Sequence, residues 1–384
     1  MKAAIIGGKL QGVEAAYLAG KAGWDVTIVD RRPDVPASGL SPGFLLADIT
    51  AGMDLTHVLQ PFDLVIPALE NQDALDRLQF FSQQEVVPVL FDFQAYAVTS
   101  SKITSDQLLA GIHVPMPVPY PDCNFPVIAK PSRGSGSRGI CVIHDSKQLR
   151  SHLAAAPGEQ VIQGVVNGPS YSLEVVGYPG NYTALQVTEL EMDPGFDCKR
   201  VIAPADLSPR MISDFENTAI TIAETLVLRG LMDIEVILDQ DVLKVLEIDA
   251  RLPSQTPVTV HASTGINMLQ FLEERLSSSL GNGRSMAGNQ RGVVYEHVRV
   301  SGNELTVTGE HAMSTTGPLR LEKNFFGADE AITDQSDGRS DWVATLIITA
   351  ENRVMAWKKR EAVISDILRF FHLDTYSDPY PDIS

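Results

Sequence analysis

The sequence has few cysteines and no long apolar run. Three cysteines occur among 384 residues, and none has the CxxC spacing of a zinc site or a redox pair. This excludes a disulfide framework and is typical of a reducing compartment, so we expect a cytoplasmic protein. No apolar run has the length of a transmembrane helix, and the opening MKAAIIGG is too short and glycine-rich for a signal peptide.

Basic residues are also scarce. The chain has 30 Lys and Arg against 48 Asp and Glu, which gives a formal net charge of -18. This balance argues against nucleic acid or an anionic membrane as a partner, and it is compatible with a basic small molecule. At 44% hydrophobic residues, the chain is long enough for two to four domains with cores of their own.

The common phosphate-binding fingerprints are incomplete. GGKLQG at 7–12 is not a full GxGxxG, and the loop at 131–139 lacks the GKS/T of a P-loop. The pattern nevertheless predicts a strand at 2–6, a helix at 13–22 and a strand at 26–29 that ends on Asp30, which is a Rossmann-like start. Its glycine turn either binds an anion or is only a steric requirement.

Further elements complete a first domain. We expect strands at 44–49, 64–68 and 86–91 and a helix at 72–83. Glu70 follows the predicted strand at 64–68, at the sheet edge where open α/β proteins bind ligands. Its alternative role is to stabilise the start of the next helix.

The clearest chemical signal lies at 230–257. Two alternating apolar runs flank Asp-Gln-Asp at 239–241, which predicts a β-hairpin. Glu247, Asp249 and Arg251 share one face of the second strand, and the hairpin brings Glu235 towards them. Converging carboxylates need a cation, and hard oxygen ligands beside an arginine suit Mg²⁺ that holds a polyphosphate. The alternative for such a strand is a solvated sheet face.

A glycine- and serine-rich loop forms a second signal. A strand at 125–130 ends on Lys130, the loop occupies 131–139, and a strand resumes at 140–143. Its N–H and hydroxyl groups, with Arg133 and Arg138, can surround phosphate oxygens; otherwise it is an ordinary hairpin. The other predicted elements are helices at 94–109, 146–156, 213–228, 263–280 and 364–371, strands at 160–163, 171–177, 183–188 and across 293–349, and a disordered tail after 374.

Taken together, several segments resemble the ATP-grasp superfamily. They are Lys102, PVIAKPSRGSGSRGI, VIQGVVNG, YSLEVVG and GLMDIEVILD with LKVLEIDAR. The resemblance covers nearly the whole chain and implies an α/β fold that is α+β in its ATP-grasp part. A Rossmann-like pre-ATP-grasp domain would span 1–93 and the two-lobed ATP-grasp domain 94–290, with its lid at about 113–168 and its carboxylate-bearing lobe at about 169–290. A β-rich cap would span 291–384.

The resemblance also implies a ligand set. Lys102 and Lys130 would bracket ATP, Arg251 would steady an acyl phosphate, and two Mg²⁺ ions would bind Glu235, Glu247 and Asp249. The loop residues Ser135, Gly136, Ser137, Arg138 and Gly139 would cover the phosphates, and adenine would contact Gln163, Gly164, Val165 and Val166. Two positions depart from the family pattern: Gln163 replaces an acid, and Asp249 replaces an asparagine.

Within the superfamily, GGKLQGVEAAYL, Glu70 and LEIDARLPSQTP look like the ligases of pyrrolysine biosynthesis. Those enzymes join (3R)-3-methyl-D-ornithine to the ε-amine of L-lysine, so the implied substrates are 3-methylornithine or D-ornithine, and L-lysine. Leu10, Gln11 and Glu70 would face lysine, and Glu70, Glu174 and Asp233 would receive ammonium groups. Arg200, Ser172, Ser254, Gln255 and Thr256 would hold the ornithine-like substrate. A second nucleotide would lie near Lys9, Asp30, Asp48 and Ile49, and His261 and His297 are weak candidates for proton acceptors.

Three alternatives stay open at this stage. A nicotinamide-dependent oxidoreductase would use the first βαβ unit but leaves the carboxylates unexplained. A non-catalytic nucleotide sensor would require a broken metal site. A purine-biosynthesis ligase acting on aminoimidazole ribotide would need a basic pocket in the first domain, where Arg31 and Arg32 lie past the strand end. The sequence leaves open whether the chain forms a homodimer.

Overall fold

The first part of the chain forms a parallel sheet in the order β3-β2-β1-β4. The computed structural model describes residues 1–134, 136–277 and 290–381, so Ser135 lies outside the described residues. The strands are β1 (Lys2–Ile6), β2 (Asp25–Asp30), β3 (Gly43–Leu46) and β4 (Leu64–Pro67). The helices are α1 (Leu10–Lys21), the short 3-10 helix η1 (Pro36–Gly39), α2 (Leu55–Leu59) and α3 (Gln72–Ser82). The predicted βαβ start is therefore confirmed.

One predicted strand of this domain is wrong. Residues 86–91 make a single bridge, between Val65 and Val89, instead of a strand. Pro88 interrupts the run because it has no N–H group to donate to a neighbouring strand.

A small antiparallel sheet follows, in the order β6-β5-β7. Its strands are β5 (Val127–Pro131), β6 (Cys141–Ile143) and β7 (Gln160–Gly164), and α6 (Ser146–Ala155) packs beside them. The predicted single helix at 94–109 is two helices, α4 (Phe93–Thr99) and α5 (Lys102–Gly111). The break occurs because the Ser101 side chain accepts a hydrogen bond from the N–H of Thr104 and so caps α5. Lys102 consequently stands at the start of α5, where its N–H donates to the carbonyl of Ser132.

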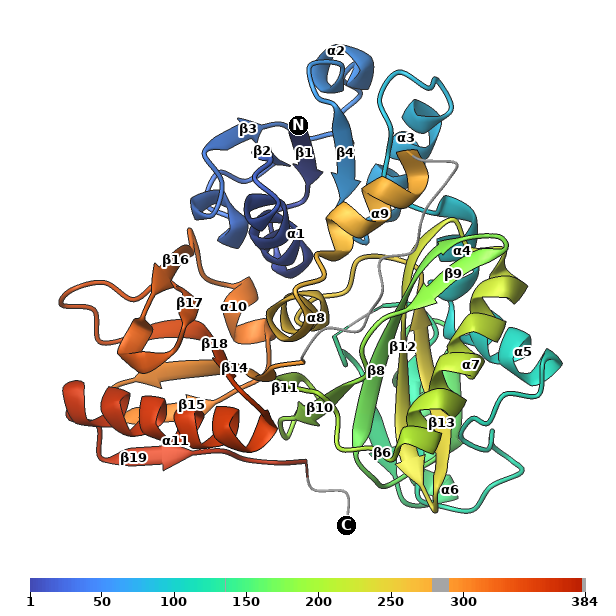
Figure 1. The fold of residues 1–384 in the computed structure, drawn as a ribbon. Helices are drawn as coiled ribbons and strands as arrows, with labels where there is room; N and C mark the ends of the chain where they lie inside the picture. Colours follow the sequence, from blue (N-terminus) through green and yellow to red (C-terminus); the bar gives the residue numbers. More distant parts are fainter. Residues whose placement is uncertain (135, 278–289, 382–384) are drawn as a thin grey trace.

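The third sheet contains 12 of the described strands and runs through the molecule (Figure 1). Its longest path is β13-β12-β8-β10-β11-β14-β18-β17-β16, with β9 beside β8, β15 beside β14, and β19 beside β15. The strands are β8 (Ser170–Tyr178), β9 (Asn181–Ala184), β10 (Thr188–Met192), β11 (Cys198–Ala203), β12 (Gly230–Asp239), β13 (Val242–Asp249), β14 (Gly292–Ser301), β15 (Glu304–Val307), β16 (Arg320–Lys323), β17 (Glu330–Thr333), β18 (Trp342–Ala350) and β19 (Thr375–Ser377). The β11–β14 pairing carries this sheet across the predicted boundary at 290/291, and the domain division stays a prediction.

The helices around this sheet refine several expectations. They are α7 (Pro209–Leu226), α8 (Thr256–Thr264), α9 (Met268–Ser277), α10 (His311–Ser314), η2 (Phe325–Gly327) and α11 (Arg353–Phe370). The predicted helix at 263–280 is interrupted, because α8 ends at Gly265 in the left-handed conformation; the stretch 278–280 lies outside the described residues. The last helix begins earlier than predicted, since the Asn352 side chain caps it. Within the tail predicted to be disordered, residues 375–377 instead pair as β19 with β15, and residues 382–384 lie outside the described residues.

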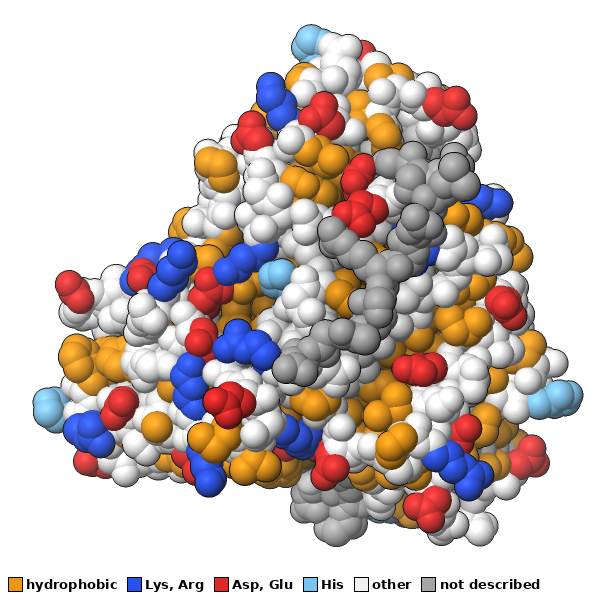
Figure 2. Space-filling model, viewed as in Figure 1, with side chains coloured by type: hydrophobic (Ala, Val, Ile, Leu, Met, Phe, Trp, Pro, Cys, Tyr) orange, Lys and Arg blue, Asp and Glu red, His pale blue; other side chains and the backbone are white. Residues whose placement is uncertain are grey.

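Helix α1 joins the first sheet to the rest of the molecule, since it packs against α8 and α9 (Figure 1). Glu14 of α1 is buried and accepts a 2.7 Å hydrogen bond from the N–H of Val258 in α8. Tyr17 of α1 donates to Glu330 of β17. Figure 2 shows charged side chains of both signs scattered over one face. Within the described ranges, no helix is long and apolar enough to cross a membrane.

Candidate active site

Strands β8, β12 and β13 present two parallel rows of polar side chains. In register, Glu235 of β12 lies between Ser172 of β8 and Glu247 of β13. Two residues along, Asp233 lies in the same way between Glu174 and Asp249. The β-hairpin that connects β12 to β13 turns at residues 240–241, where both residues have positive φ. The predicted hairpin is thus confirmed, and its register places Glu235 opposite Glu247.

These carboxyl groups repel one another in a buried setting. Burial, reinforced by Glu247 and Asp249, raises the pKa of Glu235 to about 7. Burial also raises the pKa of Asp249 and of Glu174 to about 7, and that of Asp233 well above its usual range. The site therefore favours whatever supplies positive charge, either a metal ion or a cationic substrate.

Three cationic side chains lie beside these two rows of polar side chains. Lys102 contacts Glu247 at 2.5 Å, and Arg251 contacts Asp249 at 2.7 Å and Glu70 at 3.0 Å. Burial opposes the charge on Lys102, but the neighbouring Glu247 outweighs it and raises its pKa. Burial lowers the pKa of Lys130, whose ammonium donates to the carbonyl of Leu246.

The carboxylates are not yet arranged around a common centre. Among the described residues, no group of three or more His, Cys, Asp or Glu side chains stands ready to hold a metal ion. Two of the three predicted metal ligands form ion pairs with basic side chains: Glu247 pairs with Lys102, and Asp249 pairs with Arg251. Their role as metal ligands stays a prediction.

A cavity of about 430 Å³ lies between the small sheet and the large one. The two predicted lysines, the glycine-rich loop and the β7 segment all line it, and Glu235 and Glu247 form one end. The predicted residues among its lining are Lys102, Lys130, Gly136, Ser137, Arg138, Gln163, Gly164, Val165, Val166, Glu235 and Glu247. Gly139 has a φ of +80° in the same loop but does not line the cavity.

Gln163 offers an unused acceptor in this cavity. Its Nε2 donates to Asp106 at 2.8 Å, which fixes the orientation of the amide because a carboxylate only accepts. Its Oε1 is buried and has no hydrogen-bond partner. A buried carbonyl oxygen without a donor is matched by an amino group such as the one on adenine.

A smaller cavity of about 180 Å³ opens on the far side of the same carboxylates. It shares Glu235 and Glu247 with the larger one, so these two side chains stand at the junction between the cavities. The other predicted residues that line it are Leu10, Gln11, Glu70, Gly136, Ser137, Ser172, Asp233, Asp249, Arg251, Ser254, Gln255 and Thr256. Glu174 does not line it but lies next to it in the register, with Oε2 buried and unpartnered.

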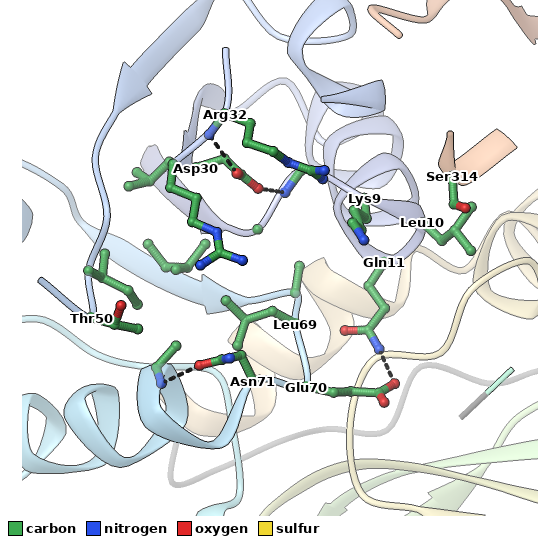
Figure 3. A pocket seen from close by; sticks show the side chains of 18 of the residues that line it. Lys9, Leu10, Gln11, Asp30, Arg32, Thr50, Leu69, Glu70, Asn71 and Ser314 are labelled. Atoms are coloured by element: carbon green, nitrogen blue, oxygen red, sulfur yellow. Dashed lines mark hydrogen bonds between the residues drawn. The ribbon is translucent and has the colours of Figure 1, made fainter. Parts of the chain in front are cut away.

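A third cavity, of about 700 Å³, lies at the carboxyl edge of the first sheet (Figure 3). Lys9, Asp30, Asp48 and Ile49, predicted for a second nucleotide, all line it. Asp30 is held by the N–H groups of Gly8 and Arg32, and Gln11 donates to Glu70 at 2.9 Å. Arg31 and Arg32, which lie past the end of their strand, line this cavity together with Arg133 and Arg138 from the glycine-rich loop region.

Other predicted residues have partners elsewhere. Arg200 is fully buried, each of its three nitrogens donates to an acid, Glu191, Glu296 or Asp378, and it lines none of the three cavities. His297 bonds Thr345 at 2.8 Å and lines none of the three cavities, and neither does His261.

Several residues of the site were missed by the sequence reasoning. Asp197, Glu310 and His311 line the small cavity, and Tyr380 and Pro381 line the larger one. They come from a loop, a one-turn helix and a segment predicted to be disordered. No periodic pattern marks such residues, because only the tertiary fold brings them to the site.

Comparisons with known proteins agree with this geometry. A family model described as an ATP-grasp domain matches residues 99–255. The 3-methyl-D-ornithine–L-lysine ligase of Methanosarcina mazei is 34% identical over 312 residues, which cover 81% of each protein. Among solved structures, the biotin carboxylase of Campylobacter jejuni has a TM-score of 0.73 at 14% identity and covers 95% of this chain and 91% of its own.

A second solved structure has the same architecture. The N5-carboxyaminoimidazole synthetase of Staphylococcus aureus, complexed with ADP, has a TM-score of 0.69 at 18% identity and covers 94% of this chain and 96% of its own. Likeness at such low identity establishes the fold alone. It confirms the ATP-grasp fold that was predicted from the sequence. The identity to the Methanosarcina mazei enzyme goes further, and the chain belongs to the 3-methyl-D-ornithine–L-lysine ligase family of ATP-grasp enzymes.

Proposed function

We propose that this protein is an ATP- and Mg²⁺-dependent ligase that forms an amide through an acyl phosphate. Its substrates are the α-carboxylate of (3R)-3-methyl-D-ornithine and the ε-amine of L-lysine, and its place is pyrrolysine biosynthesis in the cytoplasm. The observation that carries the proposal is the carboxylate pair Glu235 and Glu247, which separates a nucleotide-sized cavity from a small acidic one. The 34% identity to the Methanosarcina mazei ligase supports the choice of substrates.

The residues at the junction fit a magnesium site. Glu235, Glu247 and Asp249 provide hard oxygen ligands, and a cation at the junction would offset the burial that raises the pKa of Glu235 and of Asp249 to about 7. When bound there, one or two Mg²⁺ ions would neutralise the phosphate oxygens and the carboxylate that approaches them. The number of carboxylates at the junction is what supports two bound ions instead of one.

The chain itself contributes charge, orientation and exclusion of water. Lys102 and Lys130 lie along the nucleotide cavity, where they offset phosphate charge during transfer. Arg251, oriented by Asp249 and Glu70, is placed to steady the acyl phosphate in the small cavity. Gly136 and Ser137 line both cavities at the junction, where they would shield a product that water would hydrolyse.

The acidic row suits a dibasic amino acid. Glu174 and Asp233 are buried, and each has a side-chain oxygen without a partner. An ammonium group that binds between them would gain two acceptors and lower the pKa of both acids. Ser254, Gln255 and Thr256 lie on the same cavity wall as donors for a substrate carboxylate.

One observation favours a second candidate. The basic cavity at the first sheet would suit a phosphorylated ribotide, so a purine-biosynthesis ligase stays the runner-up. The same cavity would also suit the second nucleotide that we expect near Lys9 and Asp30. An oxidoreductase explains neither the carboxylate rows nor the lysines, and a non-catalytic sensor does not need Arg251 between two acids.

The test is ATP turnover with Mg²⁺, scored as ADP and phosphate release together with the product mass. We expect release that requires D-ornithine and L-lysine together, and a product equal to their sum less water. Glu247→Gln should lower turnover by about 10²-fold or more, because it removes charge at the junction. Turnover with aminoimidazole ribotide instead would overturn the substrate assignment, and tight ADP binding without any turnover would favour the sensor.

A further inference from the structure

His311 stands where two of the cavities meet. The small cavity and the large basic one share Leu10, Gln11, Glu70 and His311. A substrate that passes from the first domain to the carboxylate junction therefore passes this imidazole. The inference that follows rests on the proposed function and deepens it, because it concerns how the amine substrate becomes a nucleophile.

The imidazole is held in one orientation. Its Nδ1 lies 2.8 Å from Oδ2 of Asp197, and the same carboxylate accepts the N–H of His311 at 2.9 Å. Asp193 supports this loop by accepting the N–H groups of Gly309 and Asp197. A carboxylate that receives Nδ1–H leaves the lone pair on Nε2, which is the arrangement of an oriented general base.

The glycine-rich loop closes over this pair. Gly136 lies against the Cε1–Nε2 edge of the ring, where a Cβ atom would lie 2.3 Å from Cε1 and 2.5 Å from Nε2 of His311. A residue with a side chain at this position would therefore cover Nε2, and glycine leaves that edge open. The neighbouring Ser137 hydroxyl donates to the carbonyl of Phe196 at 2.5 Å. Gly136 and Ser137 line both the nucleotide cavity and the small cavity, and His311 lines the small cavity together with Glu235 and Glu247.

The reaction needs a base at this place. An alkyl amine arrives as an ammonium ion, which has no lone pair to attack an acyl carbon. We propose that His311, oriented by Asp197, is the catalytic base that takes a proton from the ammonium group of the amine substrate. The charged groups that face the ring are Asp197, Glu310 and Arg138. The two carboxylates favour the protonated imidazole that forms.

The step balances without any further reactant. The amine nitrogen forms a bond to the acyl carbon, and the bond from that carbon to the phosphate oxygen breaks with its electron pair. The first proton of the ammonium group passes to Nε2 of His311 before the attack and then to solvent. The second leaves the nitrogen after the attack and passes to the departing phosphate, so the products are the amide and HPO4²⁻. No oxidant or reductant is required.

The experiment compares two nucleophiles on the full-length protein. L-lysine needs deprotonation, whereas hydroxylamine is neutral at pH 7 and reacts with an acyl phosphate to give a hydroxamate without a base. For His311→Gln we expect amide formation with lysine to fall by about 10²- to 10³-fold, with hydroxamate formation within about twofold of the wild type. Raising the pH should recover part of the lysine rate, because free amine then forms in solution.

Two further variants keep the test decisive. Asp197→Asn should show the same split between nucleophiles with a smaller loss, and His144→Gln, at an exposed position, should change neither rate. An equal loss with both nucleophiles, or an unchanged lysine rate, would overturn the role of His311 while the ligase assignment stands. A wild-type protein that forms neither amide nor hydroxamate would overturn the proposed function itself, and the inference with it.

Discussion

A single side chain, Gln163, fixes how the nucleotide cavity can recognise a base. Its amide is oriented by Asp106, and its Oε1 is buried without a donor. We expect Gln163→Leu to raise the KM for ATP about tenfold, since a lost hydrogen bond to a buried acceptor is worth roughly 1–2 kcal/mol. The kcat should change little, because the adenine lies far from the atoms that react.

Direct titration with ADP measures the same effect without the amino acids. The Kd for ADP should rise in parallel with the KM, and Gln94→Leu, at an exposed position of α4, serves as the control. A variant that binds ADP as tightly as the wild type would show that Gln163 does not contact the base.

At the scale of elements, the segment that contains β19 forms part of the nucleotide cavity. Asp378 contacts Lys199 and Arg200, each at 2.6 Å, and both of these bases are fully buried. This anchor places Tyr380 against the cavity, where its hydroxyl donates to Glu191 at 3.1 Å.

We expect Asp378→Asn to release this segment. Removing one partner of buried charges costs roughly 3 kcal/mol, since Lys199 and Arg200 keep their charge in a poor solvent. Limited proteolysis should then cut within 375–381, and the KM for ATP should rise. Asp374→Asn is the matched control, because Asp374 is exposed and contacts Asn303 instead of a buried base. Unchanged proteolysis and stability would show that the contacts of Asp378 do not hold this segment in place.

Elements specified by local signals were predictable, and those specified by tertiary contacts were not. The hairpin around Asp239 and the βαβ start carry their own turns and periodicity, so Glu235, Glu247 and Asp249 were found from the sequence. The break before Lys102 was missed because the helical pattern continues through the serine cap. No sequence pattern marks His311 or Tyr380 as site residues. They reach the site only because the fold brings distant segments of the chain together.

At the scale of the molecule, the first domain is docked through a buried acid. Glu14 of α1 accepts the N–H of Val258 in α8, and Tyr295 of β14 donates to its other oxygen. Burial raises the pKa of Glu14 to about 8, from 4.5 for the ordinary side chain. The folded protein therefore holds a proton on Glu14 at a pH where the unfolded chain has lost it.

The sign of the pH effect follows from this difference. Between pH 4.5 and about 8 the folded state binds more protons at Glu14 than the unfolded state does, so the free energy of unfolding falls as the pH rises. Glu14→Gln removes this titration and keeps a neutral side chain of the same shape. We expect the variant to gain stability relative to the wild type from pH 5 to pH 8, by on the order of 1.4 kcal/mol for each pH unit of that window.

Urea unfolding at several pH values measures this difference for the whole chain. The comparison at each pH cancels every other titrating group, and Glu304→Gln, at an exposed position, should run parallel to the wild type. A constant gap between Glu14→Gln and the wild type would mean that Glu14 is ionised in the folded state. A gap that widens with pH would show that the contact between the first domain and the carboxylate-bearing lobe is made by a protonated acid.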